Sequence, residues 1–206
     1  MSENRETAIP ANWRLASLPQ ALTAPEVARL LESFILEGPS ARRPNAMVRC
    51  ALDMGLRTSE VAKLGLADID WRAGTVTLRR TKSRREDILP LPATTGRVIA
   101  EYLRFERPAT SNRAVFVRHV APRDEPIGRD VVHRAVREAY RRAGLPHTRA
   151  HALRHTLASR LLERGSSLKE VADVLRHRSL NTTLIYAKLD TQRLVAVALP
   201  WPGSAS

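Results

Sequence analysis

The spacing of apolar residues along the chain predicts a mostly helical protein. In the segment TAPEVARLLESFI, Val27, Leu30 and Phe34 fall on one face of a helix. Thr23 and Glu26 have the spacing of a capping box, which marks the start of that helix. Apolar residues recur with this helical spacing in residues 46–54, 57–66, 93–107, 129–144, 151–165, 167–177 and 179–190. We expect a helix in each of these segments.

The period of the pattern changes in the middle of the chain. GTVTLRR (residues 74–80) and EDILPLP (residues 86–92) are β-prone runs on either side of TKSR, so they predict an antiparallel hairpin with a basic tip. Residues 68–71 are a candidate third strand, and AVFV (residues 114–117) is a candidate extended piece. We therefore expect an α+β fold that is mainly helical, with a small three-stranded antiparallel sheet.

The length and the pattern favour one domain with two irregular ends. The chain has 206 residues, enough for one good core. Residues 1–22 carry two prolines and little periodicity, which predicts an N-terminal arm or linker. Residues 23–190 carry the regular pattern, and residues 191–206 form a tail whose TQRLVAVAL stretch is a candidate helix for docking on a neighbouring protomer.

The charge of the chain points to a polyanionic partner. Thirty-four Lys and Arg against 21 Asp and Glu give a formal net charge of +13, with a sequence pI near 11.2. Nucleic acid is the expected partner, although a basic composition also arises for solubility alone or from a GC-rich genome. Cys50 is the single cysteine, so no internal disulfide forms. No apolar run approaches the ~18 residues of a membrane span, and we expect a cytoplasmic protein.

The stretch HALRHTLASRLLERG begins a helix with an unexpected group of cations. His151 and Arg154 lie three residues apart, so they project from one face near the N-terminal end of the helix. That end already carries a partial positive charge, which makes two more cationic groups unfavourable there. An anion bound at this end would remove the conflict, because side chains and free backbone N–H groups would converge on it.

Other segments supply groups that suit phosphate chemistry. Arg57 follows MGL at a predicted helix start, and Lys82 lies at the hairpin tip. His177 ends VADVLRH, and Tyr186 follows in a short predicted helix. A planar guanidinium holds two phosphate oxygens, Lys and His transfer protons, and a tyrosine oxygen is a nucleophile.

Each of these residues also has an ordinary structural interpretation. Arg57 alone is typical of a surface ion pair, Lys82 of a solvated turn, and Tyr186 of a half-buried core aromatic. The complete set of residues favours the catalytic interpretation over these separate ones. His119 and His133 are expected to be surface residues.

The histidines around residue 151 also raise the alternative of a zinc site. His147, His151 and His155 have helical spacing of four, which suits metal ligands. No cysteine or carboxylate stands nearby to complete such a site, and Arg149 and Arg154 would repel a dication. We expect no metal there.

Five motifs together resemble the tyrosine recombinase, or phage integrase, family. They are GLRTSEVAKL, TKSRRE, HALRH, VLRHRSLNTT and IYAK, in family order between about residue 22 and residue 188. The resemblance implies a tyrosine-recombinase catalytic domain and a site-specific DNA recombinase or integrase. It implies six catalytic residues: Arg57, Lys82, His151, Arg154, His177 and Tyr186.

The resemblance also implies a role for each of these residues. Arg57 and Arg154 would clamp the scissile phosphate, and Tyr186 would attack it to give a 3′-phosphotyrosyl link. Lys82 would protonate the leaving 5′ oxygen, and His151 would accept or donate a proton near the nucleophile.

Two further implications concern partner groups and cofactors. His177 would donate a hydrogen bond to a phosphate oxygen, and Glu60 would be a partner of Arg57 rather than a catalyst. The phosphotyrosyl bond conserves the energy of the broken phosphodiester, so neither ATP nor a metal ion is implied as a cofactor.

The expected partner is double-stranded DNA, whose backbone the arginine-rich segments LRRTKSRRE and AYRRAG would follow. The resemblance implies a monomer in solution, a homotetramer on DNA, and a location at the nucleoid. We expect no N-terminal core-binding domain before Thr23. Three alternatives stay open: a naturally short family member, a truncated product, or a DNA clamp supplied by a separate or accessory protein. Two alternatives remain: a type IB topoisomerase-like enzyme, and a non-catalytic or truncated accessory protein derived from an integrase.

Overall fold

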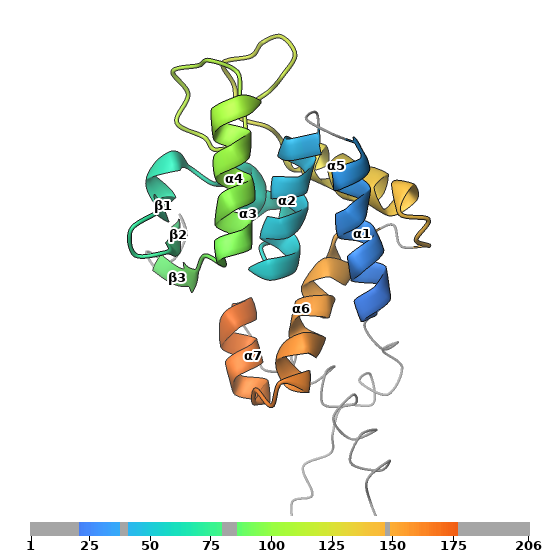
Figure 1. The fold of residues 1–206 in the computed structure, drawn as a ribbon. Helices are drawn as coiled ribbons and strands as arrows, with labels where there is room; N and C mark the ends of the chain where they lie inside the picture. Colours follow the sequence, from blue (N-terminus) through green and yellow to red (C-terminus); the bar gives the residue numbers. More distant parts are fainter. Residues whose placement is uncertain (1–20, 38–40, 80–85, 147–148, 177–206) are drawn as a thin grey trace, which may run out of the picture.

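The protein is described by a computed structural model that places residues 21–37, 41–79, 86–146 and 149–176 (Figure 1). It confirms a mainly helical α+β fold with one small antiparallel sheet. No helix within these ranges is long and apolar enough to cross a lipid bilayer. The elements are α1 (Ala24–Glu37), α2 (Arg42–Asp53), α3 (Thr58–Lys63), the short 3-10 helix η3 (Leu66–Asp68), β1 (Ile69–Asp70), β2 (Thr75–Arg79), β3 (Glu86–Pro90), α4 (Ala93–Phe105), α5 (Arg129–Arg142), α6 (His151–Glu163) and α7 (Leu168–Leu175).

Helix α1 begins where its capping residues predict. The backbone N–H of Thr23 donates to Glu26 Oε2 at 2.7 Å, and the N–H of Glu26 donates to Thr23 Oγ1 at 3.4 Å. Helix α2 begins at Arg42, four residues before the predicted apolar run. Pro44 lies in its first turn, where a missing N–H breaks no helical hydrogen bond.

The sheet has the predicted hairpin and the predicted third strand. Its order is β1-β2-β3 and both pairings are antiparallel, with Val76 opposite Ile69 on one side and Leu89 on the other. These three side chains are buried, and they attach the sheet to the core. The hairpin tip, which contains Lys82, lies outside the described residues.

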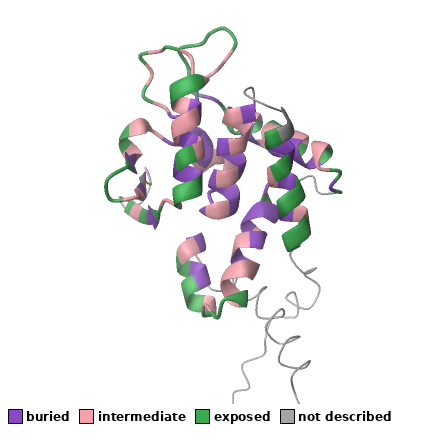
Figure 2. Cartoon of the chain, viewed as in Figure 1, coloured by how far each residue is buried: buried purple, intermediate pink, exposed green. Residues whose placement is uncertain are grey.

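Helix α2 lies at the centre of the molecule and contributes to two apolar clusters. Met47 and Cys50 belong to a cluster shared with the sheet and α4, and Cys50 is fully buried there. Val48 and Leu52 belong to a second cluster shared with α1, α5 and α6. Figure 2 shows this buried centre, with the exposed positions of α1 and α4 facing outward.

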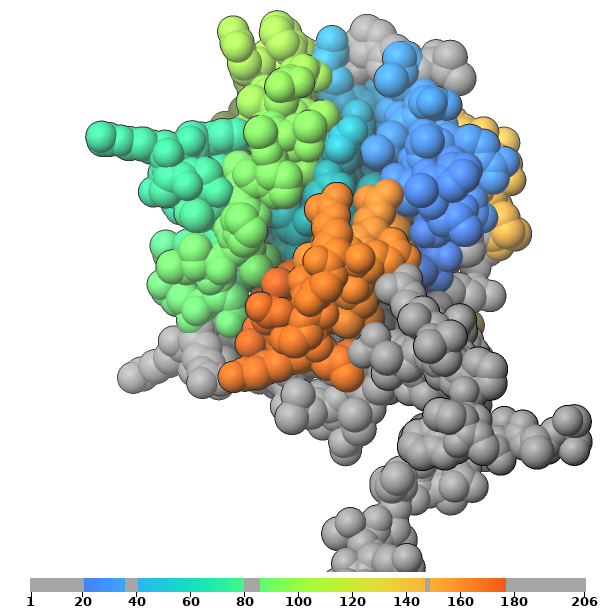
Figure 3. Space-filling view, turned by 60° about the horizontal axis from the view of Figure 1, so that its bottom comes forward, coloured from blue at the N-terminus to red at the C-terminus, as the bar shows by residue number. Residues whose placement is uncertain are grey.

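Helices α6 and α7 pack together at one end of the molecule (Figure 1), and their residues form the orange area of the space-filling view (Figure 3). Ala158, Val171 and Leu175 are buried between them. A capping box starts α7, with the N–H of Ser167 donating to Glu170 Oε2 at 2.7 Å. The predicted helix over residues 179–190 and the tail after it lie outside the described residues.

Candidate active site

Three of the six predicted catalytic residues lie in the described part of the chain. Arg57 is the N-cap residue of α3, and His151 and Arg154 lie in the first turn of α6. Lys82, His177 and Tyr186 lie outside it. The described part of the site is formed by α3, α6 and the end of α7.

Arg57 is held by the carboxylate of Glu60 from two directions. The backbone N–H of Arg57 donates to Glu60 Oε2, and its Nη1 donates to Glu60 Oε1, both at 2.8 Å. Burial alone raises the pKa of Glu60, but the charge of Arg176 and the bonds from Arg57 outweigh it and hold that pKa below its ordinary value. Glu60 is thus an ionised partner of Arg57, as predicted.

Arg154 is a buried residue, with 5% of its surface exposed. Its Nη1 donates to the carbonyl of Gly55, and its Nη2 donates to the carbonyl of Leu175. Arg57 Nη2 donates to the next carbonyl along the chain, that of Arg176, at 3.3 Å. The last carbonyls of a helix lack partners within it and carry partial negative charge. Two guanidiniums from α3 and α6 therefore converge on adjacent carbonyls where α7 ends.

A third guanidinium, which the sequence motifs did not single out, completes this group. Arg176 Nη2 donates to Glu60 Oε2 at 2.7 Å and to the carbonyl of Gly55 at 3.2 Å. We call Arg57, Glu60, Arg154 and Arg176 the arginine cluster. It combines three positive charges with one negative charge, so its net charge favours an anion.

Gly55 was also missed by the sequence analysis, although both Arg154 and Arg176 donate to its carbonyl. Its φ is +61°, a left-handed conformation that favours glycine. A Cβ atom there would lie 2.9 Å from Cδ2 of both Leu157 and Leu175. Gly55 therefore lets the chain pass close to α6 and α7.

Replacement of Gly55 by alanine is expected to destabilise the protein by roughly 2–4 kcal/mol, because backbone strain adds to side-chain overlap. Gly144 provides a matched control, since its φ is +62° and nothing lies within 4 Å of a Cβ built there. Gly144→Ala carries the backbone strain alone, about 1 kcal/mol. Chemical denaturation of both variants measures the difference. Equal losses of stability would contradict the close approach at Gly55.

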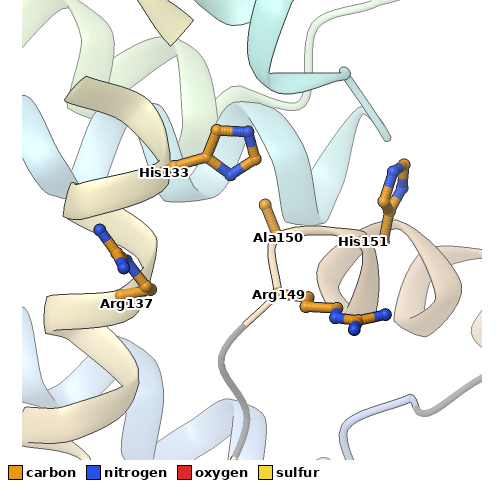
Figure 4. A pocket seen from close by; sticks show the side chains of 5 residues that line it. All are labelled: His133, Arg137, Arg149, Ala150 and His151. Carbon is orange, nitrogen blue, oxygen red and sulfur yellow. The ribbon is translucent and has the colours of Figure 1, made fainter. Parts of the chain in front are cut away.

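A cleft opens beside His151, between α5 and the start of α6 (Figure 4). It has a volume of about 390 Å³ and is lined by His133, Arg137, Arg149, Ala150 and His151. His133 was expected at the surface, but it is half-buried, and its Nε2 lies 3.1 Å from Thr58 Oγ1 at the start of α3. The cationic lining extends the positive charge outward from the arginine cluster.

The neighbours of His151 affect the pKa of its imidazole. Burial lowers the pKa of its imidazole from 6.5, and the charges of Arg154, Arg57, His133 and Arg149 lower it further. The ring is therefore mainly neutral at pH 7 and able to accept a proton. Among the placed residues, no group of three or more His, Cys, Asp or Glu side chains is arranged to bind a metal ion.

Comparison with known proteins identifies the family. The profile of the phage integrase family matches residues 20–193. The chain belongs to the phage integrase family. This confirms the resemblance inferred from the five sequence motifs.

Relatives within the phage integrase family include proteins from bacteria and archaea. The chain is 44% identical over 199 residues to a protein of Sinorhizobium fredii named integrase/recombinase y4rA, covering 96% of this chain and 48% of that protein. It is 32% identical to the tyrosine recombinase XerA of Pyrococcus furiosus, covering 86% of this chain and 60% of that one. The chain thus spans about half to three fifths of the length of these relatives.

A solved structure confirms the fold of this phage integrase family member. The XerH site-specific recombinase, crystallised with a palindromic difH substrate after cleavage, superposes with a TM-score of 0.76 and 26% identity. The match covers 90% of this chain and 54% of that one. The predicted tyrosine-recombinase catalytic fold is confirmed.

Proposed function

We propose that the chain is the catalytic domain of a site-specific recombinase that cuts and rejoins double-stranded DNA. The observation that carries this proposal is the convergence of Arg57 and Arg154 on adjacent carbonyls at the end of α7, beside His151. His177, which follows Arg176 in the sequence, is one of the six predicted catalytic residues. The structural relative XerH is a site-specific recombinase bound to its palindromic difH substrate in a post-cleavage complex.

The arginine cluster and the cleft are suited to a DNA phosphate. Guanidinium groups bind phosphate oxygens in a planar, two-pronged geometry. Negative charge grows on these oxygens as phosphorus becomes pentacovalent, so fixed cations stabilise the transition state more than the ground state. We propose that Arg57 and Arg154 provide this stabilisation.

Burial of the other two tyrosines supports Tyr186 as the nucleophile. The chain has three tyrosines, and Tyr102 and Tyr140 are fully buried in the core. Burial raises the pKa of both phenols, which disfavours the reactive phenolate. Tyr186 is therefore the tyrosine proposed to reach DNA.

The proposed reaction is an exchange of one phosphodiester for another. The oxygen of Tyr186 forms a bond to phosphorus while the bond to the 5′ oxygen breaks, leaving a 3′-phosphotyrosyl link. His151 accepts the phenol proton, Lys82 donates a proton to the leaving 5′ oxygen, and His177 donates a hydrogen bond to the phosphate. Attack by a 5′-hydroxyl on the phosphotyrosyl bond reverses these steps and rejoins the strand.

Covalent capture on DNA tests this proposal. Nicked duplexes with randomised cores are incubated with the protein, and denaturing gels show whether labelled DNA becomes attached to it. If a covalent adduct forms and a second DNA strand with a 5′-hydroxyl end can then be joined to the captured DNA, the result supports the recombinase. Supercoil relaxation by the monomer would indicate the type IB topoisomerase-like alternative, and absence of any adduct would indicate the accessory protein.

DNA binding is expected to raise the pKa of His151, because a nearby phosphate opposes the positive charges that lower it in the free protein. An NMR titration of the histidine side chains, with and without saturating duplex, measures the change. His119, whose pKa of about 4 results from burial and from Arg43 and Arg123, is the internal control. A His151 pKa that stays unchanged or falls further on binding would contradict phosphate placement beside it.

Arg137 and Arg149 are exposed residues that line the cleft, and we expect each to neutralise a backbone phosphate. Alanine at either position is expected to weaken binding equally for all DNA sequences and to reduce the slope of log K against log salt by about one. Fluorescence anisotropy at several salt concentrations provides the measurement. Arg104→Ala, on the exposed face of α4, is the control and should keep the original slope.

The assembly of the active complex is part of the proposal. We propose that the free protein is a monomer and that four copies assemble on DNA, with residues 191–206 contacting a neighbouring copy. The complex would act at the nucleoid in the cytoplasm.

A further inference from the structure

Arg176 has a backbone conformation that its residue type makes costly. Its φ is 54° and its ψ is 46°, so it is left-handed at the C-cap of α7. Within the placed part of the chain, it is the sole residue other than glycine with positive φ. Glycine adopts this conformation without strain and is the usual residue at such a helix end. The turn by itself therefore gives no reason for an arginine.

The side chain of Arg176 is also in a costly environment. Only 2% of it is exposed, and a buried cation is unfavourable unless its charge and its N–H groups are paired. Its Nη1 donates to the carbonyl of Val174 at 3.0 Å, and its Nη2 donates to Glu60 Oε2 and to the carbonyl of Gly55. Its Nε is buried and has no hydrogen-bond partner among the residues that the structure describes. Strain and desolvation at one residue point to a specific role for its guanidinium.

Arg176 connects the segments around the proposed site. Glu60 lies on α3 and Gly55 just before it, whereas Arg176 ends α7. Asp87 of β3 also acts electrostatically on Arg176, and β3 directly follows the hairpin segment that contains Lys82. The guanidinium therefore lies where α3, the end of α7 and the sheet approach one another.

The carboxylate of Glu60 connects Arg176 to Arg57. Glu60 Oε2 is occupied by Arg176 Nη2 and by the backbone N–H of Arg57, so the Arg57 guanidinium bonds only to Oε1 among the carboxylate oxygens. Without Arg176, Glu60 Oε2 would keep the bond from the Arg57 backbone N–H, but its other lone pair would be open, so the Arg57 guanidinium could bond to both oxygens as a two-pronged pair. That pairing would neutralise Arg57 and draw it away from a phosphate.

We infer that Arg176 is a positioning residue that occupies one oxygen of Glu60, and so holds the Arg57 guanidinium in the orientation that meets the scissile phosphate. The same side chain anchors the end of α7 through Gly55 and Val174. The inference rests on the proposed function, because it assigns Arg57 to the phosphate.

Arg176→Gly separates positioning from stability, because glycine relieves the backbone strain while removing the guanidinium. The expected result is a roughly 10- to 100-fold slower formation of the covalent adduct at saturating DNA, from misplacement of Arg57. DNA affinity is expected to stay close to that of the wild type, and the melting temperature to fall by no more than about 4 °C. Arg176→Lys retains a charge on Glu60 and is expected to restore part of the rate.

Arg164→Gly is the matched control, because Arg164 is an exposed C-cap residue at the end of α6. This variant should form the adduct at the wild-type rate. A wild-type rate in Arg176→Gly would overturn the inference, and so would an Arg176→Lys rate no faster than that of Arg176→Gly.

A measurement without DNA keeps the inference separate from the proposed function. Glu60→Gln, Arg176→Gly and the double variant are compared by thermal unfolding. If Glu60 and Arg176 are coupled, loss of Arg176 lowers the melting temperature less in the Glu60→Gln background than in the wild type. Additive effects would overturn the inference. Coupling without any wild-type adduct would instead locate the failure in the proposed function.

Discussion

Tyr186→Phe is expected to abolish the covalent protein–DNA adduct, with a loss of roughly 10⁴-fold or more. The substitution removes the one oxygen proposed to attack phosphorus and keeps the ring, so DNA affinity and thermal stability should be retained. Single-turnover reactions with the captured duplex, resolved on denaturing gels, measure the loss. Binding and unfolding experiments on the same variant show that the protein still folds and holds DNA.

One of the two buried tyrosines provides a control for this prediction. Tyr102→Phe removes a phenol oxygen inside the core, where it lies away from solvent. That variant is expected to form the adduct at close to the wild-type rate. If Tyr186→Phe still forms an adduct, another residue is the nucleophile and the proposed role of Tyr186 is wrong.

Arg154→Ala is expected to lower the rate of cleavage by about 10²- to 10³-fold, the usual cost of removing a group that stabilises transition-state charge. Most of the loss should fall on the rate at saturating DNA, because the phosphate charge grows during the reaction. The variant should also melt at a lower temperature, since the carbonyls of Gly55 and Leu175 lose a donor.

Two further variants test whether the loss of cleavage in Arg154→Ala is specific to the guanidinium at that position. Arg154→Lys retains one charge without the planar fork, so its rate is expected to lie between those of Arg154→Ala and the wild type. Arg160→Ala removes an arginine from the last turn of the same helix and should leave the cleavage rate unchanged. Equal losses in Arg154→Ala and Arg160→Ala would indicate a general effect of charge rather than a bound phosphate.

The helices and strands were predictable because their signals are local. Thr23 and Ser167 both cap helices with an acidic residue three positions later, and both caps are present. Val76 lies between two threonines, the alternation expected of a strand, and it pairs with Leu89 across the hairpin. The start of α2 was misplaced because its first turn is polar and its burial depends on contacts far away in the sequence.

The site was predictable only as far as its motifs extend. Arg57, His151 and Arg154 each belong to a recognisable stretch, and the structure brings these three together. Gly55 and Arg176 depend on contacts between α3, α6 and α7, which no local pattern reports. For His133 the available signal was its spacing of four from Arg137 on α5, which puts an imidazole and a cation on one helical face.

The most direct test of the account is the response of Arg154→Ala to a duplex whose scissile phosphate is replaced by a neutral methylphosphonate. The central claim is that the arginine cluster neutralises charge on that phosphate, so a neutral group should need Arg154 much less. We predict that the rate ratio between the wild type and Arg154→Ala is large on the phosphate duplex and falls by about tenfold or more on the methylphosphonate duplex. An equal ratio on both duplexes would contradict the account.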